Sequence, residues 1–197
     1  MAQDRVAEFD ASYAGTPPWD IGRPQPAFAA LAASGNLRGR VLDVGCGTGE
    51  HVLMAAELGL DATGIDIAPS AIRLAEAKAR ERGVGARFLV GDACALDTLG
   101  ERFDTVLDCG LFHVFEPEDR PRFVASLAAA VAQGGRYSML CFSEHEPDGW
   151  GPHRVTQDEI REAFSDGWTV ESVDASELFI TLRPNPVAAW SSSIVRL

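Results

Sequence analysis

The feature that most constrains this chain is the stretch Val41-Leu42-Asp43-Val44-Gly45-Cys46-Gly47-Thr48-Gly49. An apolar segment typical of a strand ends at three alternating glycines, and a helix-forming run, residues 50–58, follows at once. Glycine is required where the backbone turns sharply or where a ligand touches the main chain, because a Cβ would block the approach. The first amides of the next helix then face that ligand. The stretch therefore predicts a strand, a ligand-binding loop and a helix.

Two further acidic residues follow expected strands. Residues 59–65 form an expected second strand that leads into Asp66, which follows Gly45 by about 20 residues, the offset at which nucleotide-binding units place a carboxylate on ribose hydroxyls. Residues 86–91 form the expected third strand, which leads into Asp92. Asp also caps helices, which is a structural explanation for either residue. Two carboxylates at the ends of successive strands favour a nucleotide-like cofactor.

The Gly-x-Gly-x-Gly spacing, with Asp43 at the strand end, resembles the S-adenosylmethionine-dependent methyltransferases of class I, whose fold is Rossmann-like. The spacing disfavours an NAD-dependent oxidoreductase, which carries Gly-x-Gly-x-x-Gly. The resemblance implies that the loop approaches the methionine part of the cofactor, that Asp66 holds the ribose, and that Asp92 binds the adenine. The cofactor-binding residues that we expect are Trp19, Asp43, Gly45, Cys46, Gly47, Asp66, Ile67, Asp92, Ala93 and Cys109.

Strand-like and helix-like segments alternate along the rest of the chain, which predicts an α/β fold with a doubly wound, mostly parallel sheet. Expected strands cover 102–108, 136–142, 168–173, 177–182 and 189–196, and expected helices cover 68–82, 118–132 and a segment that begins at Thr156. Gly134-Gly135 is expected to end the second of these helices. The resemblance implies seven strands, helices on both faces and an antiparallel last strand. We expect one domain, 1–197, with an N-terminal lid segment at 1–35 and a Rossmann-like core at 36–197.

The proline-rich segment 13–26 is the second informative motif. Its prolines exclude a helix and an interior strand, so we expect an ordered lid over the mouth of the sheet, with Trp19 at the cofactor and the acceptor. A surface wrap in which Trp19 fills a groove is the structural alternative. The run resembles the entry segment of thiol, halide and thiopurine methyltransferases, and of mycobacterial enzymes that act on quinone-like or hydroxylated heterocyclic compounds.

The loop 108–115 borders the transferable methyl group in proteins of this family. It lacks the Asn/Asp-Pro-Pro-Tyr/Phe motif of DNA and protein-glutamine methyltransferases. We expect His113 to be catalytic, because an imidazole with a pKa of about 6.5 can take the proton of a phenol-like or N-hydroxy acceptor. A structural hydrogen bond from His113 within the loop is the alternative. The residues expected to line the acceptor site are Trp19, Phe112, His113 and Trp150.

The remaining histidines and the carboxylates of segment 143–150 are not expected to take part in the site. His51 and His153 are expected at the surface. The segment 143–150 contains carboxylates and a histidine, but neither a His-Glu-x-x-His spacing nor an Asp-Asn pair, so no metal site is expected.

Charge and composition narrow the choice of partners. The 197 residues are 46% hydrophobic and carry a formal net charge of −12, which repels nucleic acid. We find no signal-like segment and no run of about 18 apolar residues, so no membrane partner is expected. The four cysteines form no Cys-x-x-Cys pair and indicate buried thiols in a reducing compartment. We therefore expect a cytoplasmic monomer or homodimer.

These observations predict an S-adenosylmethionine-dependent methyltransferase. Its acceptor is expected to be an oxygen, or else a nitrogen or sulfur, of a small aromatic or heterocyclic molecule, in detoxification or secondary metabolism. A thiol or halide methyltransferase and a non-catalytic S-adenosylmethionine-binding module are the alternatives.

Overall fold

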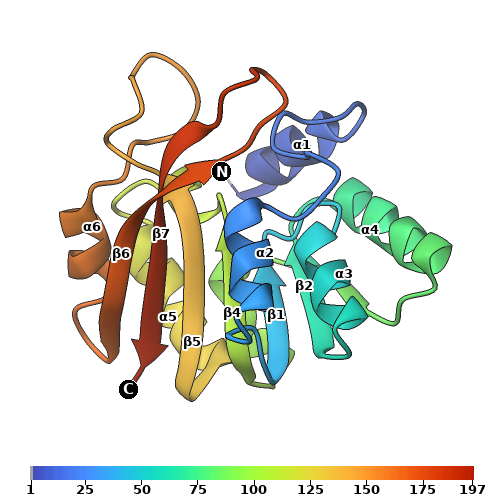
Figure 1. The fold of residues 1–197 in the computed structure, drawn as a ribbon, viewed down its shortest axis with the longest axis horizontal. Helices are drawn as coiled ribbons and strands as arrows, with labels where there is room; N and C mark the ends of the chain where they lie inside the picture. The colour runs from blue at the N-terminus through green and yellow to red at the C-terminus, as the bar shows by residue number, and fades with distance from the viewer. Residues whose placement is uncertain (1) are drawn as a thin grey trace.

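The computed structural model describes the backbone of residues 2–197 and the side chains from Arg5 onward, and it contains one seven-stranded sheet (Figure 1). The strands are β1 (Arg40–Val44), β2 (Asp61–Asp66), β3 (Arg87–Val90), β4 (Phe103–Cys109), β5 (Val131–Phe142), β6 (Trp168–Leu178) and β7 (Val187–Arg196). The α-helices are α1 (Ala2–Ser12), α2 (Pro26–Ala33), α3 (Glu50–Glu57), α4 (Pro69–Arg82), α5 (Arg120–Ala130) and α6 (Gln157–Ala163). Two 3-10 helices, η1 (Ala93–Leu99) and η2 (Phe112–Val114), follow β3 and β4.

The sheet has the order β3-β2-β1-β4-β5-β7-β6. The pairs among β1 to β5 are parallel, whereas β7 runs antiparallel to both of its neighbours, β5 and β6. The predicted α/β class, the seven strands and the antiparallel last strand are therefore confirmed.

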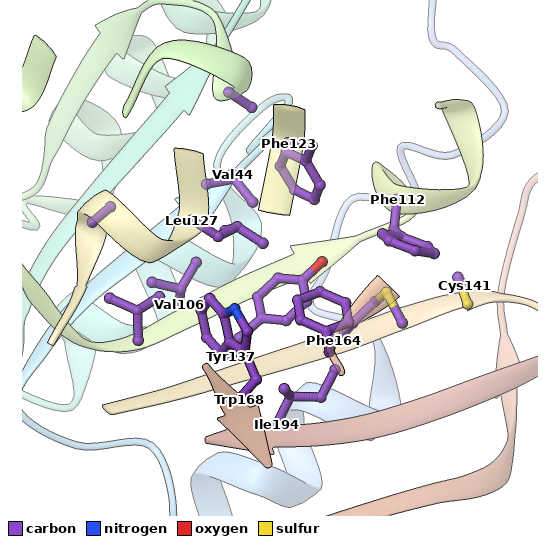
Figure 2. Packing of buried hydrophobic residues seen from close by; sticks show 14 of the residues in the cluster. Val44, Val106, Phe112, Phe123, Leu127, Tyr137, Cys141, Phe164, Trp168 and Ile194 are labelled. Atoms are coloured by element: carbon purple, nitrogen blue, oxygen red, sulfur yellow. The ribbon is translucent and has the colours of Figure 1, made fainter. Parts of the chain in front are cut away.

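Each face of the sheet carries its own hydrophobic core, because successive residues of a strand point to opposite faces. In β1, Val41 joins the core under α2 and α3, while Leu42 joins the core under α5 and α6. The core on the α5 side is rich in aromatic rings, including Phe123, Tyr137 and Phe164 (Figure 2). No helix among the described residues is long and apolar enough to cross a membrane.

The boundary between α5 and β5 differs from the prediction. The helix ends at Ala130, and β5 begins at Val131 and continues through Gly134-Gly135 to Phe142. The register with β4 shifts within this stretch, since Phe103 pairs with Val131 and Thr105 with Arg136. The glycine pair lies in this irregularity, and Gly134 has a φ of 73°. Pairing with β4 thus overrides the local signal for a helix end.

The C-terminal strands also differ from the prediction. β6 is continuous from Trp168 to Leu178, and the expected separate strand at 177–182 does not form, because residues 179–186 connect β6 to β7. The first 35 residues contain α1 and α2 in addition to the proline-rich segment.

Candidate cofactor and acceptor site

The predicted cofactor residues gather at the carboxyl ends of the central strands. In the parallel pairs Val44 lies beside Ile65 and Asp108, and Asp66 lies beside Val90. This register brings the glycine loop after β1, the end of β2 and the loops after β3 and β4 to one edge of the sheet. Ligands of open α/β sheets bind at this edge.

The glycine loop is held close to its surroundings. A Cβ on Gly49, where φ is 85°, would lie 2.7 Å from the ring of Phe88, so only glycine fits there. The amides of Gly45 and Cys46 both donate to the Ile65 carbonyl, and the amide of Gly47 donates to Asp66. The loop is therefore fixed to β2 before any ligand binds.

Asp66 is buried at the end of β2, and backbone amides orient both of its oxygens. Oδ2 accepts a 2.8 Å hydrogen bond from Gly47, and Oδ1 accepts one of 2.8 Å from Ala68. Burial raises the pKa of the Asp66 carboxyl, and the two amides oppose this shift. Asp66 is not the helix cap, because Ala68 is the N-cap of α4 and one partner of Asp66 lies in the glycine loop.

Asp43 is 1% exposed, and neither of its carboxylate oxygens has a hydrogen-bond partner among the described residues. A buried carboxylate is costly unless a cation or a hydrogen-bond donor reaches it. An ionisable side chain near this carboxylate is His51, whose Nδ1 lies 3.6 Å from Asp43 Oδ2. The prediction that His51 lies at the surface is wrong, because α3 packs it onto Phe28 and it is buried, whereas His153 is exposed as expected.

Asp92 lies at the third strand end but also serves as the N-cap of η1. Its Oδ1 accepts a 2.8 Å hydrogen bond from Cys94, and its Oδ2 lies 3.2 Å from Arg122. The next residue, Ala93, is buried against the α5 core. The structural explanation for Asp92 therefore holds, and its role toward adenine stays a prediction.

The remaining predicted cofactor residues differ in what they offer a ligand. The Cys46 thiol is buried against Gly64 of β2. Only the backbone of Cys46 is therefore left to face a ligand. Cys109 is half-buried at the end of β4, and burial raises the pKa of its thiol. Ile67 is half-buried immediately after β2.

The N-terminal segment lies across the glycine loop. Trp19 is 42% exposed, and its Nε1 donates a 3.1 Å hydrogen bond to the Tyr13 hydroxyl. That hydroxyl lies 3.1 Å from the position that a Cβ on Gly47 would take. Burial and the nearby charge of Asp66 raise the pKa of Tyr13 well above its usual value. Sequence reasoning missed Tyr13, although it directly precedes the proline-rich run.

Three contacts hold this segment in place. Asp20 Oδ2 accepts a 2.8 Å hydrogen bond from Thr48 in the glycine loop. Thr181, in the connection between β6 and β7, donates its amide to the Pro18 carbonyl at 2.8 Å. Asp10 at the end of α1 accepts from the amide of Ser70 at the start of α4.

His113 is buried in η2, and its Nδ1 accepts a 3.0 Å hydrogen bond from the Phe142 amide. Burial, together with the nearby Arg154 and His153, lowers the pKa of His113 to about 3. The Gly110 backbone lies close to the ring, since a Cβ on that glycine would lie 3.2 Å from Nε2. Because Nδ1 accepts the bond from Phe142, a neutral imidazole carries its proton on Nε2, so neither nitrogen keeps a free lone pair for an acceptor proton, and the geometry favours the structural alternative.

Two residues that were predicted to line the acceptor site, Phe112 and Trp150, pack against other side chains of the protein. Phe112 is 0% exposed and packs in the core with Phe123 and Phe164, so the prediction that it lines the acceptor site is wrong (Figure 2). The cause is η2, which turns this ring toward α5. Trp150 is half-buried, and the guanidinium groups of Arg154 and Arg183 lie 5.3 Å and 4.9 Å from its ring.

Asp108 is a buried carboxylate that sequence reasoning left without a role. It accepts hydrogen bonds from the Leu111 and Phe112 amides and from the Tyr137 hydroxyl. It therefore holds the loop after β4, which carries His113, in its observed shape. The signal that could have found it is an acidic residue at the end of an apolar strand.

Comparisons with known proteins identify the family to which the chain belongs. A family described as a methyltransferase domain matches residues 41–135. The 2-heptyl-1-hydroxyquinolin-4(1H)-one methyltransferase of Mycobacteroides abscessus is 39% identical over 190 residues, which covers 91% of this chain and 84% of the relative. Probable thiol methyltransferase 2 of Arabidopsis thaliana is 31% identical and covers 98% of this chain and 88% of the relative.

A solved structure from work on the conversion of a disulfide bond into a thioacetal group in echinomycin biosynthesis has a TM-score of 0.89. It is 39% identical, and the match covers 97% of this chain and 92% of that one. A magnesium protoporphyrin IX methyltransferase from Synechocystis with bound S-adenosylmethionine shares the fold, with a TM-score of 0.67 over 87% of this chain and 76% of that one. The chain belongs to the class I, Rossmann-like, S-adenosylmethionine-dependent methyltransferases.

Proposed function

We propose that this enzyme transfers the methyl group of S-adenosylmethionine to a hydroxyl oxygen of a small, flat heteroaromatic acceptor. The observation that carries the proposal is the pair of buried carboxylates, Asp43 and Asp66, on either side of the glycine loop. The M. abscessus relative, which is named for a hydroxyquinolinone, supports the acceptor class.

Asp43 and Asp66 would hold the two ends of the cofactor. The unpartnered carboxylate of Asp43 fits the ammonium of the methionine moiety, because a buried anion needs a cation or donors. Asp66 fits the ribose hydroxyls, because each of its oxygens accepts one hydrogen bond from a backbone amide and keeps another lone pair for a hydroxyl. The backbones of Gly45, Cys46 and Gly47 would line the methionine side. When bound, the cofactor supplies a methyl group on a positively charged sulfur.

The protein's own contribution to the reaction would be positioning and the exclusion of water. Methyl transfer is an in-line displacement, so holding the two reactants in line accounts for much of the acceleration. Trp19 and Tyr13 would cover the site from the N-terminal segment. Asp108 and His113 would fix the loop after β4, beside which the acceptor would lie. An N-hydroxy or phenolic acceptor would then bind as its anion, after losing its proton to solvent outside the site.

The roles of Ile67, Asp92, Ala93 and Cys109 at the adenine and methionine, and of Trp150 at the edge of the acceptor site, remain part of this proposal. So do the single domain, 1–197, and its lid segment, 1–35. The net charge of −12 supports the absence of a nucleic-acid partner. We further propose that the protein is cytoplasmic and is a monomer or a homodimer. Light scattering coupled to size-exclusion chromatography distinguishes the monomer from the homodimer by molar mass.

Sulfur acceptors are the second candidate function. The A. thaliana relative named as a thiol methyltransferase matches almost the whole chain. A thiolate needs no base, and this agrees with a His113 whose Nδ1 is already engaged.

The deciding experiment measures S-adenosylhomocysteine release and product mass with a panel of acceptors. The panel contains an alkyl 1-hydroxyquinolin-4-one, a simple phenol, hydrosulfide and thiocyanate. We expect the hydroxyquinolinone to give the highest kcat/KM and an O-methylated product. A higher kcat/KM for hydrosulfide or thiocyanate would overturn the oxygen acceptor, and no turnover with any member would count against the heteroaromatic and sulfur classes alike.

A further inference from the structure

A line of polar contacts joins the N-terminal segment to the unpartnered carboxylate of Asp43. His51, on the first turn of α3, is 8% exposed, and its Nδ1 lies 3.6 Å from Asp43 Oδ2. Its other ring nitrogen, Nε2, accepts a 3.1 Å hydrogen bond from the backbone amide of Gln25. Gln25 is itself buried, and its side chain makes two hydrogen bonds, of 2.8 Å and 2.9 Å, with the backbone of Phe179.

The contact with Gln25 determines where the imidazole proton lies. A backbone amide can only donate, so Nε2 must carry a lone pair. In a neutral imidazole the proton then sits on Nδ1, which faces Asp43. Phe28 packs edge-on against the ring, with 4.8 Å between centroids, and limits its rotation.

The distance between His51 and Asp43 leaves room for a ligand. The 3.6 Å between His51 Nδ1 and Asp43 Oδ2 is beyond ordinary hydrogen-bond length, so His51 does not saturate the carboxylate. Both Asp43 oxygens therefore keep lone pairs for a cation.

We infer that His51 is a positioning residue for cofactor binding, which turns the Asp43 carboxylate toward the methionine ammonium while Gln25 selects its tautomer. The inference rests on the proposed role of Asp43. The same contacts link the segment between β6 and β7 to Asp43, since Phe179 binds Gln25 and Gln25 binds His51. A structural role, in which His51 only packs on Phe28 and accepts from Gln25, makes different predictions.

Two substitutions separate the ring nitrogens. His51→Asn puts an amide N–H near the place of Nδ1, so it keeps the donor toward Asp43 and gives up the acceptor for Gln25. His51→Gln puts a carbonyl near the place of Nε2, so it keeps the acceptor and gives up the donor. Both replacements are neutral amides, so a difference between them reports which nitrogen matters.

Isothermal titration with S-adenosylhomocysteine is the test. We expect His51→Gln to weaken binding by at least about tenfold and His51→Asn by no more than about threefold. In steady-state assays His51→Gln should raise the KM for S-adenosylmethionine and leave kcat at saturating cofactor nearly unchanged. In an Asp43→Asn background the effect of His51→Gln should disappear.

A second route uses the Gln25 backbone and does not change His51. Gln25 has a φ of −61°, which proline can adopt, so Gln25→Pro removes the amide donor. Gln25→Ala removes the same side-chain contacts but keeps the amide, and is the matched control. We expect Gln25→Pro to bind S-adenosylhomocysteine more weakly than Gln25→Ala.

Equal affinities for the Asn and Gln variants at His51, or an unchanged His51→Gln effect without the Asp43 carboxylate, would overturn the role of His51. Equal affinities for the two Gln25 variants would overturn the tautomer selection. Wild-type affinity in Asp43→Asn alone would instead overturn the proposed role of Asp43 itself.

Discussion

The hydroxyl of Tyr137 donates a 2.7 Å hydrogen bond to Oδ2 of Asp108 inside the core, where neither side chain touches solvent. Two backbone amides of the loop that carries His113 share the same carboxylate. The shape of the loop beside the proposed acceptor site therefore depends on one buried acidic group.

Asp108→Asn should change how stability depends on pH. Burial raises the pKa of Asp108 from 3.8 to about 7, so between these values the folded protein holds a proton that the unfolded chain has lost. The resulting stabilisation is complete below the unfolded pKa and is lost as the pH rises through about 7, with a slope of up to ~1.4 kcal/mol per pH unit. Urea unfolding of both proteins from about pH 4 to about pH 8 should show the variant gaining stability relative to wild type as the pH rises.

Tyr137→Phe is the control for this titration. The Tyr137 hydrogen bond lowers the pKa of Asp108, so its removal should move the midpoint of the pH dependence upward. A constant difference between wild type and Asp108→Asn across the range would show that Asp108 does not titrate there.

Asp66→Ala should weaken binding of S-adenosylhomocysteine more than it lowers stability. Hydrogen bonds to a charged acceptor are worth about 1.5–3 kcal/mol, which corresponds to about 10- to 150-fold in affinity. Calorimetric titration measures this loss. Asp61→Ala, at the opposite and exposed end of β2, is the control and should bind normally. Wild-type affinity in Asp66→Ala would leave Asp66 with a structural role alone.

His113→Asn should retain most of the activity. Asn can still accept from the Phe142 amide, whereas His113→Leu cannot and should lower both stability and kcat. A general base would contribute about 10²- to 10⁴-fold to kcat, and its loss would be repaired at alkaline pH, where the acceptor ionises unaided. We expect His113→Asn to lie within about fivefold of wild type at neutral pH. A loss of two orders of magnitude with recovery at high pH would restore His113 as the base.

Asp20→Ala should loosen the N-terminal segment. The substitution removes the hydrogen bond from Thr48 to Asp20. It also removes the negative charge of Asp20 Oδ2, which lies 3.9 Å from Lys78 Nζ. We expect the KM for S-adenosylmethionine to rise by about three- to tenfold, since one hydrogen bond contributes about 1 kcal/mol. Limited proteolysis should cut within residues 13–26 faster than in wild type. Asp148→Ala, in an exposed loop, should match wild type in both measurements.

Local patterns in the sequence were enough to predict the strand, glycine loop and helix at 41–58, because glycine spacing and apolar runs act over a few neighbouring residues. The alternation of strands and helices was enough for the α/β class and the parallel sheet. At Gly134-Gly135 the same kind of local evidence failed. There a long-range pairing with β4 draws the glycines into β5, and no nearby residue signals that pairing.

Within the site, strand and loop signals were enough to place the acidic residues Asp43 and Asp66 at the ends of their strands. The side chains that surround these two residues depend on how distant segments of the chain pack together. His51 is buried because α3 packs it beside Asp43 and against Gln25, a residue 26 positions earlier in the chain. Phe112 lies in the core rather than at the acceptor because η2 turns it toward α5. Burial is a property of the packed fold, so residue type and spacing alone do not settle it.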